Sequence, residues 1–293
     1  MPTSQILYLA ALLAAIFSFF APPIQRTLRK IGRNIWFAPP IAAAIFASAA
    51  VMAGVNRGQL VAIVTIYALL PIICVVWASG FAPDGPPHAF DFLAILLLWL
   101  PIEFGAGQNL IPRPAQGFLH SVAYGIAILL GLTLFLGYRG FPGMKINLPK
   151  GLRDLWLPLA AFVLLAPVLI VLGMAIGFLP APHLPVQSAG RMAAAAGIIL
   201  AGTALPEEIL FRALIQNLLM QRFGSGWRTL LAASVIFGAA HLDNGPQALP
   251  NWRYAILATV AGWAYGKVFY KSTTVLSSAL LHTLVDWTKH FWF

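Results

Sequence analysis

The amino-acid sequence predicts an all-α integral membrane protein, a bundle of about eight to ten transmembrane helices. Of its 293 residues, 60% are apolar and only 9% are charged, whereas soluble domains spend about a quarter of their residues on charge. The apolar residues also come in runs of roughly the 20 residues that a membrane-spanning helix needs. So little polar surface cannot cover a water-soluble globule, so lipid is expected to surround most of the exterior.

The apolar runs are bounded by proline, glycine or charged residues and follow one another along the whole chain. Their approximate ranges are 6–24, 35–55, 59–79, 91–105, 115–138, 156–179, 192–221, 229–242, 254–270 and 273–290. Runs 91–105 and 229–242 are short for a full span, so we expect a re-entrant or strongly tilted segment among them. The first run has no basic residues before it, which favours a first transmembrane helix over a cleaved signal peptide.

A polar stretch at residues 139–155 divides the chain. It contains Pro142, Gly143, Pro149 and Gly151, which make a continuous helix unfavourable. We expect a cytoplasmic linker here, between N-terminal transmembrane helices of unassigned role (residues 1–138) and a C-terminal bundle (residues 156–293). No internal repeat is apparent, which argues against a transporter built from duplicated halves.

The net charge of +10 follows the positive-inside rule of short membrane loops and does not point to nucleic acid. Alternate loops are rich in basic residues: Arg26, Arg29, Lys30, Arg33, Arg139, Lys145, Lys150, Arg153, Arg222, Arg228, Lys267 and Lys271. The loops of the other side hold fewer: Arg57, Arg113, Arg191, Arg253 and Lys289. We therefore expect a multi-pass protein of a bacterial plasma (inner) membrane with its N-terminus outside.

Charged side chains inside an apolar run suggest a buried site, because a charge at a helix centre costs about 2.5–3.5 kcal/mol on insertion scales. The segment ALPEEILFRALIQ contains Glu207, Glu208 and Arg212. Glu208 and Arg212 are four residues apart with the acid first, the favourable order for an ion pair. Glu207 is rotated by about 100° from Glu208 and points elsewhere. Pro206 predicts that a helix starts or kinks here, with first-turn N–H groups that favour negative charge.

Two later segments add histidines. In VIFGAAHLDNG, Phe237 and His241 are four residues apart, so the ring is expected one helical turn below the imidazole. In SALLHTLVDWTKHFWF, His282 and Asp286 share a helix face, where a carboxylate can accept from the imidazole and fix its tautomer. Each segment alone also fits a structural role: an ion-pair staple, a hydrogen-bonded histidine or an interfacial His–Asp pair. Together they predict a water-activating site.

The three motifs resemble those of the CPBP family, which contains CAAX prenyl proteases and bacteriocin-processing (ABI) proteins. The resembling patterns are E-E-x-x-x-R at residues 207–212, F-x-x-x-H at 237–241 and H-x-x-x-D at 282–286. The resemblance covers about residues 190–290 by motif and implies an active site buried in the C-terminal bundle. Residues 1–150 carry no signature of the family.

The resemblance also implies a role for each residue of the motifs. Glu207 and His241 would activate the attacking water, with Glu208, Arg212 and Phe237 in support. His282, together with residue 286, would stabilise the oxyanion, a contribution of about 3–4 kcal/mol per donor in other proteases. Many family members have Asn at the last position, whereas Asp286 can donate only when protonated, so orientation of His282 is the alternative role.

Two alternatives stay open for the cofactor, and two for the class of function. Glu207, His241 and His282 could supply three zinc ligands, but no H-E-x-x-H motif is present, and the resemblance favours a glutamate-dependent mechanism that requires no cofactor. We expect an intramembrane endopeptidase that cleaves a membrane-embedded or lipid-anchored protein. The alternative is a non-enzymatic transporter, immunity factor or scaffold that uses the same buried ions structurally.

Overall fold

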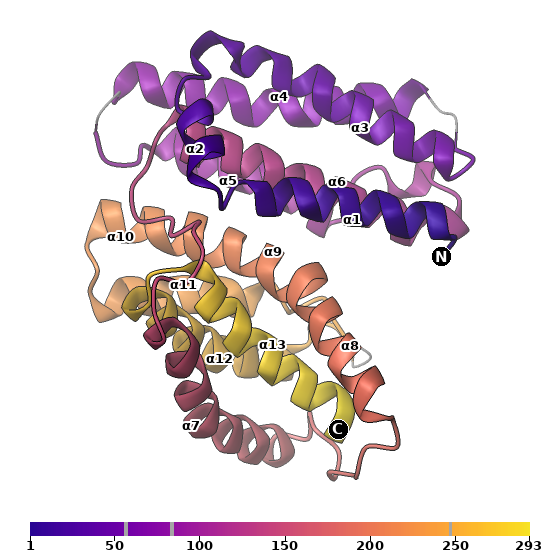
Figure 1. The fold of residues 1–293 in the computed structure, drawn as a ribbon, viewed down its shortest axis with the longest axis vertical. Coiled ribbons are helices and arrows are strands. Elements are labelled where there is room, and N and C mark those ends of the chain that lie inside the picture. Colours follow the sequence, from indigo (N-terminus) through magenta and orange to yellow (C-terminus); the bar gives the residue numbers. More distant parts are fainter. Residues whose placement is uncertain (56–57, 83–84, 246–247) are drawn as a thin grey trace. The chain divides into compact units, whose positions relative to one another are not determined.

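The chain is entirely helical wherever its structure is described. The computed structural model describes residues 1–55, 58–82, 85–245 and 248–293, and these contain helices and no strand (Figure 1). This confirms the all-α prediction. Arg57, which the charge pattern placed on the side poor in basic residues, lies outside the described residues. The chain divides into two compact units, Met1–Pro142 and Gly143–Phe293.

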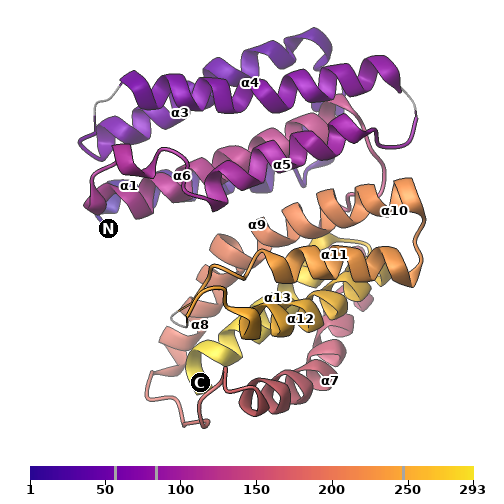
Figure 2. The same ribbon diagram turned by 180° about the vertical axis from the view of Figure 1, so that it is seen from behind.

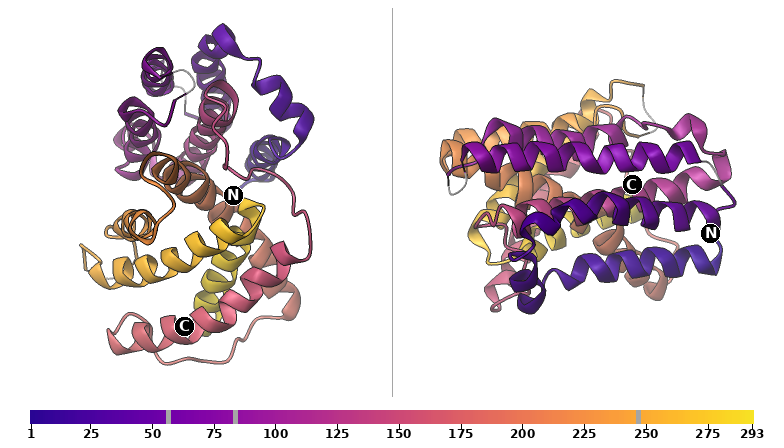
Figure 3. Two further views of the ribbon diagram at one scale, coloured as in Figure 1. Left: turned by 90° about the vertical axis from the view of Figure 1, so that its left-hand side faces the viewer. Right: turned by 90° about the horizontal axis from the view of Figure 1, so that it is seen from above.

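The N-terminal unit is a bundle of long apolar helices. Its elements are α1 (Thr3–Ser18), α2 (Pro22–Leu28), the 3-10 turn η1 (Gly32–Phe37), α3 (Ala38–Met52), α4 (Gly58–Phe81), α5 (Ala89–Glu103), the 3-10 turn η2 (Gln108–Leu110), α6 (Arg113–Gly131) and the π-helical η3 (Leu132–Tyr138). Helix α6 packs against α1, α3 and α5, while α4 packs against α3 and α5. Figure 3 shows these helices lying side by side.

A buried ion pair joins two segments of the N-terminal unit that are far apart in sequence. Arg139, just after η3, donates from Nε to Asp91 Oδ1 and from Nη2 to Asp91 Oδ2, each at 3.0 Å. Its Nη1 donates to the Ala82 carbonyl at 2.9 Å. Asp91 also accepts from the His88 backbone N–H and so caps the start of α5. Both side chains are excluded from solvent, which a charge tolerates only when it is paired.

Several helices are long and apolar enough to cross a membrane. Among the described residues, four meet this condition: Asn34–Met52, Gly58–Phe81, Arg113–Tyr138 and Arg153–Ala175. A fifth span results if the pair Thr3–Ser18 and Pro22–Leu28, bent by 82°, counts as one. The chain is a multi-pass membrane protein, as predicted. The expected eight to ten spans also included shorter or more charged helices, such as Trp227–Ala239.

The C-terminal unit holds all the residues of the predicted site. Its elements are α7 (Arg153–Ala175), α8 (Ala189–Ile199), the π-helical η4 (Leu200–Ala204), α9 (Leu205–Glu208), the π-helical η5 (Ile209–Gln216), α10 (Asn217–Phe223), α11 (Trp227–Ala239), α12 (Trp252–Lys271) and α13 (Val275–Trp292). Helix α12 packs against α11, α7 and α13. Helix α13 contacts α7, α8 and α9 as well, so it is central to the unit (Figure 2).

Helices α8 to α10 follow one another without a break in helical backbone, with α9 between two π-helical segments. Of the two expectations for Pro206, a helix start or a kink, the structure does not show a start, because the helical backbone continues through this residue. Proline has no N–H and crowds the carbonyl four residues earlier, and the preceding backbone, Leu200–Ala204, is π-helical. Glu207 and Glu208 thus sit inside a helix, where no first-turn N–H groups favour their charge. Such π-helical turns often occur at functional sites.

The segment before α7 is bonded closely to the start of α13. Lys145 Nζ donates to the carbonyls of Phe269, Tyr270 and Ser272 at 2.6, 3.0 and 2.8 Å, where α12 ends. The Asp154 carboxylate, in the first turn of α7, accepts from the Thr273 backbone N–H at 2.7 Å. These bonds hold the end of α12 and the beginning of α13, the helix that carries His282 and Asp286. The polar stretch predicted as a linker therefore also positions the site.

Candidate active site

A chain of charged contacts runs through the centre of the C-terminal unit. Arg212 Nε donates to Glu208 Oε2 at 3.1 Å, the ion pair that the spacing of four predicted. The other oxygen of the same carboxylate, Glu208 Oε1, lies 3.1 Å from His282 Nδ1. Glu208 and Arg212 are fully buried and His282 is 3% exposed. Glu208 therefore has two partners, and it ties the helix containing α9 to α13.

Two further carboxylates lie near the other nitrogen of the same imidazole. His282 Nε2 is 3.4 Å from Asp286 Oδ2 and 3.9 Å from Glu207 Oε2. The Glu207 and Asp286 side chains are 23% and 28% exposed, whereas Glu208 is sealed off. The two adjacent glutamates consequently face opposite edges of one imidazole, with the more accessible acid, Glu207, on the Nε2 side.

The second histidine follows the end of α11. His241 Nδ1 lies 2.8 Å from the Phe237 carbonyl oxygen. A carbonyl can only accept, so Nδ1 carries the hydrogen and Nε2 of the neutral ring is left as an acceptor. The Phe237 ring packs against this imidazole, with centroids 4.8 Å apart. His241 is thus held in the tautomer that a proton acceptor needs.

Aromatic rings enclose the charged groups. Tyr265 stacks on His282 at 4.7 Å between centroids and 22° between planes, and Phe237 meets His282 edge-on at 5.7 Å. The Arg212 guanidinium lies 4.7 Å above the Phe237 ring, a cation–π contact that supplements its ion pair. A Cβ added to Gly262 would lie 2.9 Å from the Phe237 ring, so glycine allows α12 to approach this closely. These contacts restrict the rotamers of the charged side chains.

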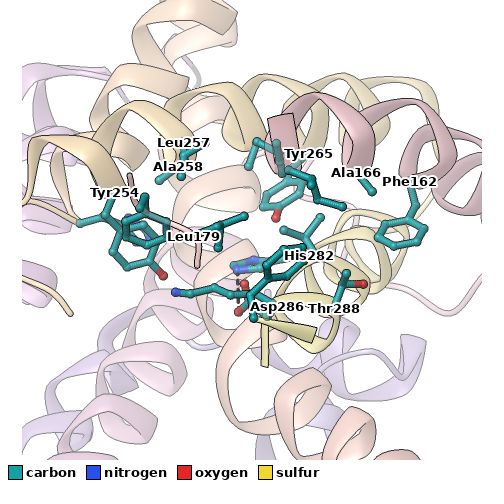
Figure 4. Close-up of a pocket in the computed structure, with 18 of the residues that line it drawn as sticks. Phe162, Ala166, Leu179, Tyr254, Leu257, Ala258, Tyr265, His282, Asp286 and Thr288 are labelled. Atoms are coloured by element: carbon teal, nitrogen blue, oxygen red, sulfur yellow. Dashed lines mark ion pairs between the residues drawn. The ribbon is translucent and has the colours of Figure 1, made fainter. Parts of the chain in front are cut away.

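A cavity opens beside the two histidines. Figure 4 shows Tyr265, His282 and Asp286 facing it, with Phe162 and Ala166 of α7 on its wall. His241 and Phe237 line the same cavity. A larger, more open cleft shares part of this lining, including Tyr254, Asp286 and Lys289. The two hollows therefore adjoin at these side chains, and a mostly apolar chamber leads to the polar groups.

The structure brings together residues that the sequence motifs did not include. Tyr265 stacks on His282, and Tyr254 meets His241 edge-on with centroids 4.6 Å apart. Lys289 lines both hollows. One available signal was its position, three residues after Asp286 and seven after His282, which puts all three on one face of a helix. The two tyrosines are eleven residues apart on α12, about three turns, and carry no motif.

Metal-binding geometry was one of the alternatives that the sequence left open. Within the part of the chain that the structure describes, no group of three or more His, Cys, Asp or Glu side chains is arranged to hold a metal ion. The set Glu207, His241 and His282 is included in that finding.

Residues 189–288 match the family model described as type II CAAX prenyl endopeptidase Rce1-like. This match supports the assignment to the CPBP family that the three motifs suggested. No curated protein and no solved structure matches the chain. The matched CPBP region begins at the first residue of α8 and contains Glu207, Glu208, Arg212, His241 and His282, along with Asp286.

The CPBP match covers about a third of the chain. It supports a CAAX-type intramembrane protease at the level of the family, while the N-terminal unit and α7 lie outside it. Helix α7 nevertheless contributes part of the cavity wall, through Phe162 and Ala166. The chamber is therefore built by more of the chain than the CPBP segment alone.

Proposed function

We propose that this protein is an intramembrane endopeptidase that hydrolyses a peptide bond near the C-terminus of a membrane-associated, lipidated protein. The observation that carries the proposal is the placement of Glu207 and Asp286 around His282 Nε2, next to a cavity that is lined by His282, Asp286 and His241. A partly accessible carboxylate, a histidine with a free acceptor nitrogen and a second oriented imidazole are the groups that amide hydrolysis by water requires.

Glu207 and His241 activate the attacking water. Water bound between them loses a proton to the Glu207 carboxylate as its oxygen attacks the scissile carbonyl carbon. His241 Nε2 accepts the second hydrogen bond of the water and orients it, because Nδ1 is engaged by the Phe237 carbonyl. The tetrahedral intermediate then collapses, the C–N bond breaks, and the proton held on Glu207 passes to the leaving amine.

His282 stabilises the negative charge of the tetrahedral intermediate. Its Nδ1 is bound to Glu208, whose charge Arg212 balances, so Nε2 is the ring atom that can donate to the substrate oxygen. Asp286 accepts from that N–H before substrate enters and keeps the ring turned towards the cavity. In other proteases, one preorganised oxyanion donor is worth about 10²–10³ in kcat.

The substrate class follows from the family description and from the cavity. CAAX prenyl endopeptidases act, by their name, on prenylated CAAX proteins, in which the modified cysteine precedes the last three residues. The chamber walls carry apolar side chains such as Phe162, Ala166 and Leu257, which suit a lipid chain. A prenylated peptide is therefore the first substrate to test.

The experiment uses purified full-length protein in liposomes and a fluorogenic peptide with an S-farnesyl cysteine fourth from its C-terminus. Glu207→Gln keeps the size of the side chain but removes the base, so we expect cleavage to fall by at least about 10²-fold. Glu103→Gln is the matched control, because Glu103 is the only glutamate outside the pair. Thermal unfolding in detergent checks that both variants fold.

Two outcomes contradict the proposal. One is cleavage by Glu207→Gln at the wild-type rate. The other is no cleavage by the wild-type protein of any lipidated peptide, which would favour the non-enzymatic alternative. Excess chelator in the same assay separates the two mechanisms: retained activity supports glutamate-dependent hydrolysis, whereas loss of activity that zinc restores supports a metal.

A further inference from the structure

Lys289 carries a positive charge at the junction of the two hollows. Its Nζ lies 4.3 Å from the centre of the Tyr254 ring and 5.0 Å from the centre of the Phe178 ring. These rings pack against each other at 5.0 Å between centroids. The ammonium is half-buried against this aromatic corner and lines both the inner cavity and the outer cleft.

This ammonium has hydrogen atoms to donate and no acceptor in the described chain. A lysine ammonium has three donors, and cation–π contacts leave them without an oxygen or nitrogen partner. No ion pair within 4.0 Å joins Lys289 to a described carboxylate, although Asp286 is three residues earlier on the same helix. Asp286 is directed instead to His282 Nε2, at 3.4 Å. The position of Lys289 therefore suits an anion that arrives with a ligand.

Tyr254 relates this cation to the reactive groups. The His241 ring lies edge-on to the same tyrosine, with centroids 4.6 Å apart, and Lys289 Nζ is 4.3 Å from the centroid. The ammonium and the His241 ring are therefore separated by less than the length of three extended residues, at about 3.3 Å each. A carboxylate bound by Lys289 would place a bond close to the terminus beside His241.

We infer that Lys289 binds the C-terminal carboxylate of the substrate and thereby determines how far from the chain end the peptide bond is cut. The inference rests on the proposed function and assigns to that site a residue that positions the substrate. The substrate would occupy the chamber with its lipid among the apolar walls and its free terminus at the aromatic corner of Phe178 and Tyr254. The cut would then fall within about three residues of the terminus.

The test compares two versions of one S-farnesylated peptide, with a free C-terminal carboxylate and with a C-terminal amide, in liposomes of neutral lipid. For wild type we expect kcat/KM to be on the order of 10- to 100-fold higher for the carboxylate, as for other hydrogen bonds to charged groups. Lys289→Met should reduce this preference to within about twofold, by raising KM for the carboxylate peptide with little change in kcat.

Two further variants separate recognition from packing. Lys289→Arg keeps the charge and should retain most of the preference. Lys267→Met is the matched control. Lys267 Nζ also lies over an aromatic ring, 5.2 Å from the centroid of Trp263, but Lys267 does not line the chamber. A purely structural role for Lys289 would lower cleavage of both peptides equally and leave their ratio unchanged.

A second measurement is the length of the released fragment, by mass spectrometry. Peptides lengthened beyond the usual terminus should still lose a fragment of constant length, counted from the free carboxylate. The inference is overturned if wild type cleaves both peptides equally, or if Lys289→Met keeps the full preference. Either result leaves the proposed function intact provided that Glu207→Gln stops cleavage. If wild type cleaves neither peptide, the proposed function and this inference both fail.

Preference for anionic lipid in place of the peptide carboxylate would also contradict the assignment. Repeating the assay with liposomes that contain phosphatidylglycerol distinguishes the two sources of negative charge. If phosphatidylglycerol competes with the peptide, and Lys289→Met abolishes that competition, a phosphate headgroup occupies the corner. Unchanged carboxylate preference in both liposomes supports the peptide terminus.

Discussion

Glu208 Oε1 and His282 Nδ1 are 3.1 Å apart, although 74 positions separate the two residues in the chain. Because Glu208 also accepts from Arg212 Nε at 3.1 Å, one carboxylate fixes both a cation on its own helix and an imidazole on α13. The four-residue spacing of Glu208 and Arg212 predicted only an ion pair. Glu208 therefore also orients His282, which that spacing did not predict. This double role leads to the first prediction.

Glu208→Gln should lower kcat by about 10- to 100-fold, the usual effect of removing a side chain that orients an active-site group. The amide cannot offer a carboxylate to both Arg212 and His282, so the ring loses its fixed orientation and the guanidinium its counter-charge. KM should change little, because Glu208 does not line the cavity. Steady-state kinetics with the farnesylated peptide measure both constants, and an unchanged kcat would contradict the assignment.

The Glu208→Gln protein should also be less stable, because the change leaves the buried Arg212 charge uncompensated. Breaking a buried pair in this way costs roughly 3–5 kcal/mol in other proteins. Arg212 retains its cation–π contact with Phe237 at 4.7 Å, so we expect the lower end of this range. Chemical unfolding in detergent, with Glu103→Gln as reference, provides the comparison.

Substitution of Asp286 by Asn and by Ala distinguishes a hydrogen-bonding role of its side chain from a requirement for its negative charge. An asparagine oxygen can still accept from His282 Nε2, and its amide can donate to an oxyanion, so Asp286→Asn should keep activity within about fivefold. Asp286→Ala removes both possibilities and should lower kcat by roughly 10- to 100-fold. If Asp286→Asn loses as much activity as Asp286→Ala, the negative charge itself is required, and the orienting role as described is wrong.

Lys145 should make the stability of the protein depend on pH. Burial lowers the pKa of its ammonium from the usual 10.5 to about 8, although Asp154 opposes the shift. Between these two values the unfolded chain holds more protons than the folded one, so the free energy of unfolding should rise with pH from about 8 to 10.5. Below pH 8 both states are protonated and this dependence disappears.

Lys145→Met tests that linkage. The difference in unfolding free energy between wild type and variant should shift in favour of wild type as pH rises from 8 to 10.5. Denaturant unfolding in detergent at several pH values measures it, and Lys267→Met, an exposed lysine of α12, is the control. A difference that is constant across this range would show that Lys145 titrates alike in both states.

Features set by neighbouring residues could be predicted from the sequence. The apolar runs gave the membrane class, and the spacing of four gave the Glu208–Arg212 pair and the contact between Phe237 and His241. Of the helix start or kink predicted at Pro206, the start is not found, because local propensity does not register a π-helical turn that precedes a proline in a continuous helix. The linker prediction, in turn, did not include the bonds of Lys145 to the end of α12.

The sequence by itself determined that lipid is the solvent, and it predicted that the chemistry lies in the last third of the chain and which face of each helix carries it. These properties follow from composition and from the 3.6-residue period of a helix. Only the tertiary structure decided that Glu208 reaches His282 and that Tyr254 contacts both His241 and Lys289. It also decided that the Lys289 ammonium, which has no acceptor among the described residues, lies at the junction of the two hollows. Such contacts join helices distant in sequence, and their distances depend on how α12 and α13 pack.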